Sequence, residues 1–292
     1  MLLIVKNLIL LIRPYQWIKN LIIFVPLVSS QKYEITSLIL CFKAIIIFSL
    51  ISSCGYIIND LFDEKYDKIH PTKKYRPLAS GKLNKEICII FSIIIFFVAI
   101  YLGINESIEF ISIIVIYLIL SFFYSFFLKK IIIFDLIVIS FLFLFRILAG
   151  SEIINVETSI YLLLFSQLFF LSLAGIKRLA ETKSFDKIEN NKLPGRPYSK
   201  NNYKIIRIIS FLTFIFSLLV LIIYISSSNA NDIYSKTFIL YSMCPIIAFW
   251  FLRMYIKANN NKITGDPIIF AIKDKVSILM LVISAVVIIS SI

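Results

Sequence analysis

The sequence predicts an all-α, polytopic membrane protein, and three observations carry this prediction. The chain of 292 residues is 60% hydrophobic and only 16% charged, and its mean hydropathy is +0.93. A soluble domain is about 45–50% apolar and about 25% charged, so soluble, disordered, collagen-like and disulfide-scaffold proteins are excluded. The apolar residues also gather in runs of about 20 residues, which is the length that a helix needs to cross a bilayer.

Nine such runs are predicted as transmembrane helices. They are too long for barrel strands and lack strict alternation of apolar and polar residues. The first 13 residues are apolar but too short to span before Arg13-Pro14. We therefore expect 1–13 to form an interfacial lead-in helix rather than a signal peptide. The predicted spans are residues 14–30, 36–58, 87–104, 109–128, 131–150, 158–176, 205–227, 234–252 and 270–291.

The Lys and Arg residues gather in alternate connecting segments. The short turns on one side hold only Lys32 and Lys236, together with six acidic residues. The opposite side holds 26 of the 30 Lys and Arg residues, in the N-terminal segment through Lys19 and in 59–86, 129–135, 177–207 and 253–275. The positive-inside rule places that basic side and the N-terminus in the cytoplasm. Frequent Ile, Lys and Asn are typical of an AT-rich bacterial genome, so we expect a multi-pass protein of the bacterial inner (cell) membrane.

Two long cytoplasmic segments stand out in what we expect to be a single transmembrane domain over residues 1–292. They lie near 59–86 and 177–204, whereas the outer turns are short. Long loops in a compact protein are usually functional or disordered. We therefore expect these two segments to carry the chemistry.

The first long segment begins with a row of carboxylates. Asn59, Asp63 and Asp67 stand at i, i+4 and i+8, so a continuing helix places them on one face, with Asp60 beside them. Carboxylates this close repel one another unless a divalent cation lies among them. Oxygen ligands suit Mg²⁺, which is usually shared with substrate phosphates. The pattern predicts a Mg²⁺ site.

Cations follow directly after these carboxylates. Lys73, Lys74 and Arg76 can hold further phosphate oxygens, so the segment is typical of a diphosphate–Mg²⁺ site. The alternative is an ordinary charged cytoplasmic loop. Two details favour the functional interpretation: the polar row starts inside an apolar run, where polar residues are expensive, and the prolines after His70 and Arg76 fix the local backbone.

These motifs resemble a known family. Asn59-Asp60-x-x-Asp63-x-x-x-Asp67, closed by Arg76-Pro77-x-x-x-Gly81, resembles the first aspartate motif of the UbiA superfamily of membrane prenyltransferases. The longer form with His70-Pro71-x-Lys73 resembles the decaprenyl-phosphate phosphoribosyltransferase branch. Further matches to that branch are Arg13-Pro14-x-x-Trp17-x-Lys19-Asn20, Tyr124-Ser125-x-x-Leu128-Lys129 with Asp135, Arg146-x-x-Ala149-Gly150, Lys177-Arg178-x-x-Glu181, Gly265-Asp266-Pro267 and Asp274-Lys275.

The resemblance implies a UbiA-like bundle of nine helices whose cytoplasmic loops cap the active site. It implies Mg²⁺-dependent transfer of 5-phosphoribose from phosphoribosyl diphosphate to a polyprenyl phosphate, with release of diphosphate, for cell-envelope glycan precursors. Asn59, Asp63 and Asp67 would hold the metal, helped by Asp60. The lipid bilayer is the expected environment, no nucleic acid is expected as a partner, and the oligomeric state, a homo-oligomer included, stays open.

The candidate substrate-binding residues fall into groups by expected role. Lys73, Lys74 and Arg76 would hold the diphosphate or the 5-phosphate, and the lone His70 either contacts substrate or shapes the loop. Lys19, Lys129, Lys177 and Arg178 are candidates for binding the acceptor phosphate. Asp135 and Arg146 are candidates as well, because ionisable groups within apolar spans are usually paired or functional. Trp17 is interpreted as an interfacial anchor, and the same interpretation stays open for Arg13.

One departure from the family pattern bears on the donor. Many family members that use prenyl diphosphates carry a second aspartate-rich motif after the sixth span. The segment 177–204 is net basic and has no Asp-x-x-x-Asp here, which suits an acceptor that arrives as a bare phosphate. Two alternatives stay open: a prenyltransferase that uses a prenyl diphosphate and an aromatic or other acceptor, and a membrane transporter. Carboxylates at one membrane surface argue against the transporter, whose substrate site is expected near the midplane.

Overall fold

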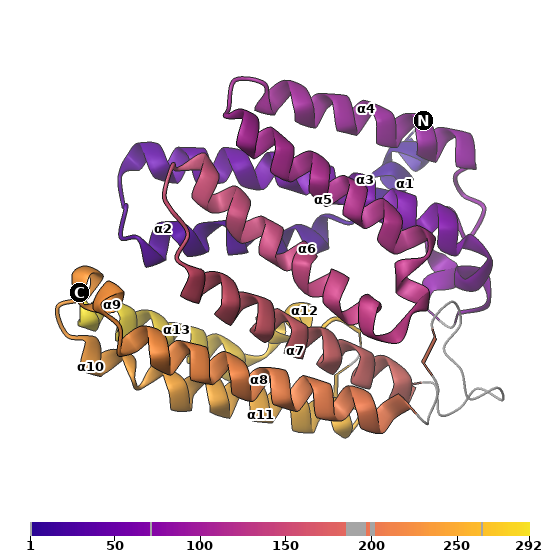
Figure 1. Cartoon of the computed structure of the whole chain (residues 1–292). Coiled ribbons are helices and arrows are strands. Elements are labelled where there is room, and N and C mark those ends of the chain that lie inside the picture. The colour runs from indigo at the N-terminus through magenta and orange to yellow at the C-terminus, as the bar shows by residue number, and fades with distance from the viewer. Residues whose placement is uncertain (1, 71, 185–196, 199–201, 264) are drawn as a thin grey trace. The chain divides into compact units, whose positions relative to one another are not determined.

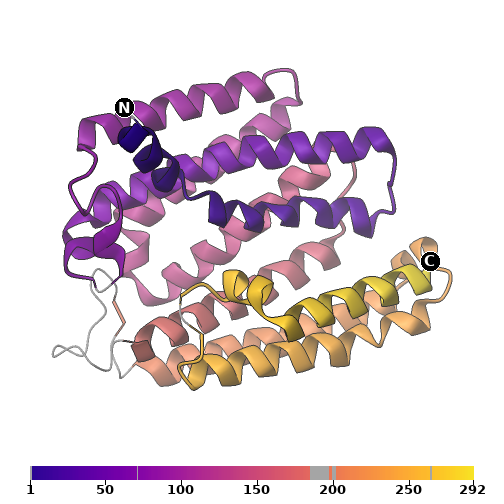
Figure 2. The ribbon, with the colours of Figure 1, turned by 180° about the vertical axis from the view of Figure 1, so that it is seen from behind.

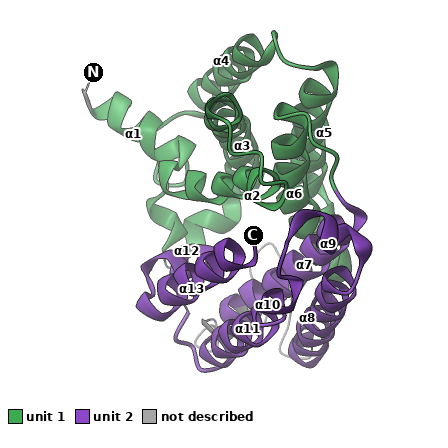
Figure 3. Cartoon of the chain, turned by 90° about the vertical axis from the view of Figure 1, so that its left-hand side faces the viewer, with its two compact units in different colours: residues 1–158, 194–197 green, residues 159–193, 198–292 purple. Residues whose placement is uncertain are grey.

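The computed structural model describes the whole chain except residues 1, 71, 185–196, 199–201 and 264. The described part is helical throughout and contains no strand. Figures 1 and 2 show long helices joined by short turns. The contacts divide the chain into two compact units, Met1–Thr158 with Pro194–Pro197 and Ser159–Leu193 with Tyr198–Ile292 (Figure 3). The predicted all-α membrane bundle is confirmed, whereas the single-domain organisation stays a prediction.

The first unit is built around its longest helix. α3 is the central element, and it contacts α1, η1, α4, α5 and α6. Buried Ile47, Phe48 and Ile51 of α3 pack with Phe110 and Ile114 in its main core cluster. The elements of this unit are α1 (Leu2–Ile12), the 3-10 helix η1 (Pro14–Phe24), α2 (Val25–Ser29), α3 (Ile35–Ile69), η2 (Lys73–Tyr75), α4 (Lys85–Gly103), α5 (Ile108–Phe126), η3 (Leu128–Lys130) and α6 (Ile132–Ile153).

The second unit pairs α7 with α8 along their length. Ser210 of α8 donates from Oγ to the Ser172 carbonyl at 2.8 Å, and the Phe214 and Phe251 rings stack with centroids 3.7 Å apart. The Trp250 indole donates to Ser277 Oγ at 3.0 Å and joins α11 to α13. The elements are α7 (Ile160–Ser184), α8 (Tyr203–Ile225), α9 (Ser228–Ile233), α10 (Thr237–Leu240), α11 (Met243–Asn259), α12 (Pro267–Lys273) and α13 (Lys275–Ser291).

Eight helical segments in the described residues are long and apolar enough to cross a membrane. Seven of them correspond to predicted spans two to eight, and the remaining one, Leu3–Ser29, joins the predicted lead-in to the first span. The predicted ninth span is represented by the shorter apolar helix Lys275–Ser291. The count of nine is therefore not confirmed over the part of the chain that is described.

Two predicted spans differ locally from the prediction. The last span, predicted as 270–291, is broken at Asp274, which is extended and caps α13 by accepting from the Ser277 backbone N–H at 2.9 Å. The first span, predicted as 14–30, runs mostly as the 3-10 helix η1. It follows a turn at Arg13 (φ 52°), whose backbone is excluded from the helical region by the proline that comes next.

Hydrogen bonds tie η1 to α3 along one line. The Trp17 indole donates to Ser53 Oγ at 3.1 Å, and Asn20 Nδ2 donates to Ser49 Oγ at 2.8 Å. At the start of this line Ser53 Oγ also donates to the Ile12 carbonyl at 3.0 Å. Polar pairing of this kind satisfies groups that would otherwise be buried without partners, so the tightly wound η1 is held in place by α3.

On its other side η1 lies against α6 at a glycine. A Cβ atom added to Gly150 would lie 2.2 Å from the backbone oxygen of Ile23. Real Cβ atoms do not approach a backbone oxygen so closely, and neither partner is a flexible side chain. Gly150 is therefore required by the backbone contact between η1 and α6.

We predict that Gly150→Ala lowers stability by about 1–3 kcal/mol or more, because the added methyl group overpacks two backbones. The check is the apparent Tm of the purified protein in detergent, followed by tryptophan fluorescence. Gly103→Ala is the matched control, because its added Cβ meets side-chain atoms and no backbone, the nearest being the end of the Ile111 side chain at 3.0 Å. An equal Tm for the Gly150→Ala variant and the wild type would contradict the close contact.

Candidate functional site

Three buried carboxylates line one face at the end of α3. The helix continues past the apolar run, as predicted, and ends at His70, whose backbone is extended before a proline. Asp60, Asp63 and Asp67 are 2%, 7% and 3% exposed. Their spacing of three and four residues stacks them on the same side of the helix. Such burial of three charges requires compensation nearby.

Three cations supply that compensation within the first unit. Arg13 forms an ion pair with Asp60. Arg76 Nη1 lies 2.9 Å from Asp60 Oδ1 and 2.5 Å from Asp67 Oδ2. Lys129, itself only 2% exposed, places Nζ 2.6 Å from Asp63 Oδ1.

The charge of this cluster therefore sums to zero. We call the six side chains the charge cluster: Arg13, Asp60, Asp63, Asp67, Arg76 and Lys129. Removing one partner of a buried ion pair leaves an uncompensated charge and costs about 3–5 kcal/mol. Each member of the charge cluster therefore constrains the others.

Asn59 links the charge cluster to α5 and η3. Its Nδ2 donates to Asp63 Oδ2 at 2.9 Å, and its Oδ1 accepts from Lys129 Nζ at 3.1 Å. Ser125 Oγ donates to the same Oδ1 at 3.4 Å. The structure thus brings Asn59, Asp63 and Lys129 together. Their roles in metal and phosphate binding stay predictions.

The turn after α3 positions Arg76. His70 Nδ1 accepts the backbone N–H groups of Thr72 and Lys73 at 3.2 and 3.3 Å, so the ring shapes this turn. The Arg76 carbonyl accepts from Ser80 N at 2.9 Å, and the turn is completed at Gly81 (φ 73°). The substrate contact predicted for His70 stays a prediction. In the structure, His70 shapes the turn that carries Arg76.

The two predicted lysines on this turn differ in exposure. Lys73 is half-buried, whereas Lys74 is exposed with Nζ 5.2 Å from the Tyr75 ring centroid. Neither position tests the predicted phosphate contacts. Both lie on the same short turn as Arg76, so the structure keeps the predicted cationic group together.

Arg146 is buried and forms no ion pair with a carboxylate of the described residues. Its guanidinium donates to Asn20 Oδ1 at 2.8 Å, to the Tyr117 hydroxyl at 3.3 Å and to the Leu142 carbonyl. The rings of Phe48, Tyr117 and Phe143 surround it with centroids 5.2–5.3 Å from Cζ. An aromatic cage stabilises a desolvated cation, so Arg146 joins η1, α3, α5 and α6.

Two further predicted residues lie in the same unit. Lys19 is 6% exposed, with Nζ 5.8 Å from the Phe143 ring centroid, so it is not a surface cation. Asp135 is fully buried and accepts from the Tyr124 hydroxyl at 3.0 Å. Both ionisable groups within predicted spans are therefore held by aromatic neighbours.

Lys177 and Arg178 belong to the second unit and lie on a helix rather than in a loop, because α7 continues to Ser184. Lys177 Nζ lies 3.5 Å from Asp266 Oδ2, which connects two of the predicted motifs. Arg178 forms an ion pair with Glu181, and its guanidinium carbon lies 5.8 Å from the Tyr198 ring centroid. Residues 185–196 and 199–201 of the predicted loop 177–204 lie outside the described residues.

The sequence left the role of Arg13 open. In the structure Arg13 pairs with Asp60, 47 positions away, and lies 5.3 Å from the Tyr56 ring centroid. Trp17, expected to be an interfacial anchor, instead binds Ser53. The sequence signal for the turn at Arg13 is the proline that follows it, because a proline disfavours helical backbone at the preceding residue.

The donor atoms at the end of α3 fit a hard cation. Asn59, Asp60, Asp63 and Asp67 offer only oxygen ligands of the kind that Mg²⁺ prefers. Among the described residues, no three His, Cys, Asp or Glu side chains lie close enough to form a metal site by themselves. A cation here therefore depends on the Asn59 amide, on water or on substrate oxygens, which is common for Mg²⁺.

The fold and this site define a membrane-embedded transferase class. A model of the UbiA prenyltransferase family matches residues 21–271. The chain therefore belongs to the UbiA prenyltransferase family.

Solved structures share the fold. A UbiA homologue from Archaeoglobus fulgidus bound to DMAPP and Mg²⁺ is similar over 97% of this chain and 99% of its own length, with a TM-score of 0.72 at 14% sequence identity. A digeranylgeranylglyceryl phosphate synthase structure has a TM-score of 0.66 at 18% identity, over 98% of this chain and 96% of its own. Both likenesses concern the fold.

Two of the relatives in sequence carry different names. Nodulation protein NoeC of Azorhizobium caulinodans is 29% identical over 90% of this chain and 85% of its own length. Decaprenyl-phosphate phosphoribosyltransferase of Mycobacterium tuberculosis strain H37Rv is 30% identical over 58% of each chain. The match thus spans little more than half of the mycobacterial protein.

We predict that Lys129→Met lowers stability by about 3–5 kcal/mol, because it leaves Asp63 buried without its cation. The apparent Tm in detergent is the measurement. The neighbouring Lys130 is exposed, so Lys130→Met is the matched control and is expected to change little. Adding Asp63→Asn to Lys129→Met is expected to recover part of the loss, and no recovery would argue against charge balance as the cause.

Proposed function

We propose that this protein transfers 5-phosphoribose from phosphoribosyl diphosphate to a polyprenyl phosphate, releasing diphosphate, for synthesis of a cell-envelope glycan precursor. The observation that carries the proposal is the neutral charge cluster, in which Asp60, Asp63 and Asp67 lie buried beside three cations. The relatives named decaprenyl-phosphate phosphoribosyltransferase support this choice of substrates within the family.

The proposed reaction is a substitution at the anomeric carbon. A phosphate oxygen of the acceptor forms the new bond to that carbon, and the bond to the diphosphate oxygen breaks with its electron pair. The acceptor is already an anion near neutral pH, so positioning and electrostatics can act without a strong base. This agrees with the position of the lone His70, whose Nδ1 accepts the backbone N–H groups of Thr72 and Lys73.

In this proposal the charge cluster exchanges partners when substrate arrives. Asn59, Asp63 and Asp67 hold Mg²⁺, helped by Asp60, while Arg76 turns to phosphate oxygens. Lys73 and Lys74 also bind the phosphates of the donor. When bound, Mg²⁺ supplies neutralisation of the charge that develops on the leaving diphosphate. The exchange replaces each internal ion pair by a pair with substrate or metal, which keeps buried charge compensated.

The remaining candidates are assigned to the acceptor side or to support. Lys19, Lys129, Lys177 and Arg178 are the proposed contacts of the acceptor phosphate. Asp135 and Arg146 would orient the surrounding helices through Tyr124 and the aromatic cage. The basic ends of these helices favour a cytoplasmic site, by the positive-inside rule.

The second candidate is a prenyltransferase that uses a prenyl diphosphate donor. It is favoured by the structures of the Archaeoglobus fulgidus homologue, which were obtained with DMAPP or GPP and Mg²⁺. The basic segment 177–204, which has no Asp-x-x-x-Asp, favours the phosphoribosyl donor instead. Both candidates use the same carboxylates.

The two donors can be separated with purified protein in detergent. We expect label from phosphoribosyl diphosphate to enter the organic phase when polyprenyl phosphate and Mg²⁺ are present, and to stay aqueous after EDTA. Consumption of geranyl diphosphate, with no transfer of labelled phosphoribose, would overturn the proposal in favour of the second candidate.

We predict that Asp63→Asn lowers this transfer at least about 100-fold, because metal stabilisation of the leaving group is worth several kcal/mol. Glu64→Gln is the matched control on the same helix. Glu64 lies outside the charge cluster and pairs with Lys68 and Lys85 at 2.7 Å each, so activity is expected to stay within about twofold. Wild-type rates in the Asp63→Asn variant, with unchanged Mg²⁺ dependence, would refute the metal role.

A further inference from the structure

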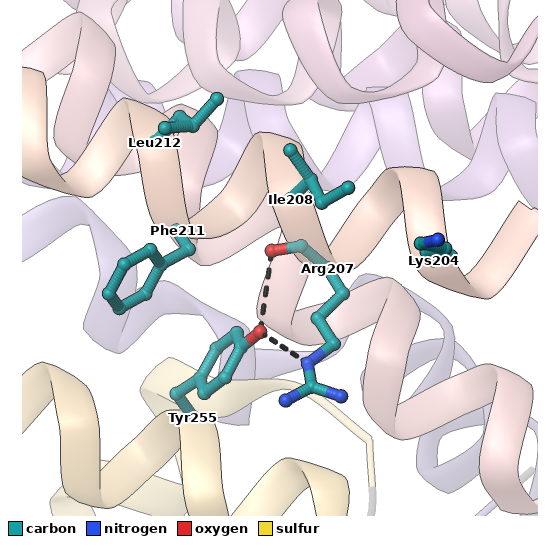
Figure 4. Close-up of a pocket in the computed structure, with 6 residues that line it drawn as sticks. All are labelled: Lys204, Arg207, Ile208, Phe211, Leu212 and Tyr255. Carbon is teal, nitrogen blue, oxygen red and sulfur yellow. Dashed lines mark hydrogen bonds between the residues drawn. The ribbon is translucent and has the colours of Figure 1, made fainter.

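A pocket between α8 and α11 belongs to the second unit, and its lining includes no member of the charge cluster. It has a volume of about 480 Å³ and is lined by Lys204, Arg207, Ile208, Phe211, Leu212 and Tyr255 (Figure 4). This volume lies within the range of about 300–1,000 Å³ of small-molecule sites. The lining combines two cations with an apolar wall.

The arginine of this pocket is fixed in place. Arg207 Nε donates to the Tyr255 hydroxyl at 2.9 Å, and the same hydroxyl donates to the Arg207 carbonyl at 3.4 Å. Figure 4 shows these bonds, and the guanidinium carbon lies 5.9 Å from the Tyr255 ring centroid. The guanidinium is therefore preorganised, and its two terminal nitrogens make no hydrogen bond or ion pair within the described part of the chain.

The cations of the pocket lack an acidic partner. Neither α8 nor α11 contains Asp or Glu. Asp274, at the start of α13, is already bound by Arg253 at 2.5 Å and by Lys257 at 2.9 Å. Lys204 is exposed and, like the guanidinium end of Arg207, forms no ion pair with a described residue. The pocket thus presents two uncompensated positive charges.

The order of the lining residues matches the depth profile of a lipid. Lys204 is the second residue of the candidate span Tyr203–Ile225, and Arg207 follows one turn later. Ile208, Phe211 and Leu212 come after them on the same helix and are 48%, 38% and 46% exposed. With a rise of about 1.5 Å per residue, the cations lie at the end of the span and the apolar side chains lie further into it.

We propose that this pocket binds an anionic membrane phospholipid of the phosphatidylglycerol type. Its phosphate would contact Lys204 and the free end of Arg207, and its first acyl methylenes would lie on Phe211 and Leu212. Basic pockets between transmembrane helices bind anionic headgroups in this way. The site uses none of the groups assigned to phosphoribosyl transfer and does not depend on that function.

The test is lipid retention by the full-length protein, measured by native mass spectrometry from detergent with phosphatidylglycerol or phosphatidylcholine of the same acyl chains. We expect at least about tenfold more phosphatidylglycerol retained, since basic side chains near the membrane surface attract anionic lipids and phosphatidylcholine carries no net charge. Lys204→Gln with Arg207→Gln is expected to abolish this preference. Tyr255→Phe, which keeps the ring but releases the guanidinium, is expected to reduce it several-fold.

Lys262→Gln with Lys273→Gln is the matched control, because it removes two exposed cations of the same unit outside the pocket. This control is expected to keep the preference. Equal retention of the two lipids by the wild type, or an equal loss in the control variant, would overturn the proposal. Displacement of phosphatidylglycerol by an equimolar polyprenyl phosphate would also overturn it, because the pocket would then select a substrate lipid.

Discussion

The compensation of three buried carboxylates by three cations is the constraint on which the first unit depends. Asp60, Asp63 and Asp67 lie on one face of α3, and each requires a cation because an unpaired charge in a membrane protein is costly. The cations come from three distant positions: the turn before η1, the turn after α3, and η3. One electrostatic requirement thus brings together chain segments from residue 13 to residue 129.

The unusual first span follows from this constraint. Arg13 must reach Asp60, and the turn at this residue starts η1 beside α3, where Trp17 and Asn20 continue the line of hydrogen bonds. Asn20 then accepts from Arg146 of α6, and Gly150 allows the two backbones to touch. The polar residues of η1 therefore connect the charge cluster to the caged arginine, which gives the candidate site a rigid support on two sides.

Much of the fold and of the candidate site was predictable from sequence, and most of the exceptions are contacts between residues far apart in the chain. Apolar run length predicted the helical bundle, and the spacing of Asn59, Asp63 and Asp67 predicted one polar helix face, because both depend on neighbours in sequence. The pairing of Arg13 with Asp60 and the burial of Lys129 depend on contacts 47 and 66 residues apart, which no local pattern contains. The break at Asp274 was missed because the predicted span 270–291 includes Lys273, Asp274 and Lys275, and the pattern does not reveal that the Asp274 carboxylate caps a new helix.

The charge cluster is proposed to exchange its internal ion-pair partners for a diphosphate and a metal. The most direct test is an experimental structure of the protein with phosphoribosyl diphosphate, Mg²⁺ and a bilayer mimetic. We expect the diphosphate to bind against Arg76 and the Arg76–Asp67 ion pair to open, while Asn59, Asp63 and Asp67 would supply the protein ligands of Mg²⁺. A bound donor elsewhere, with all the ion pairs of the charge cluster intact, would contradict this proposal.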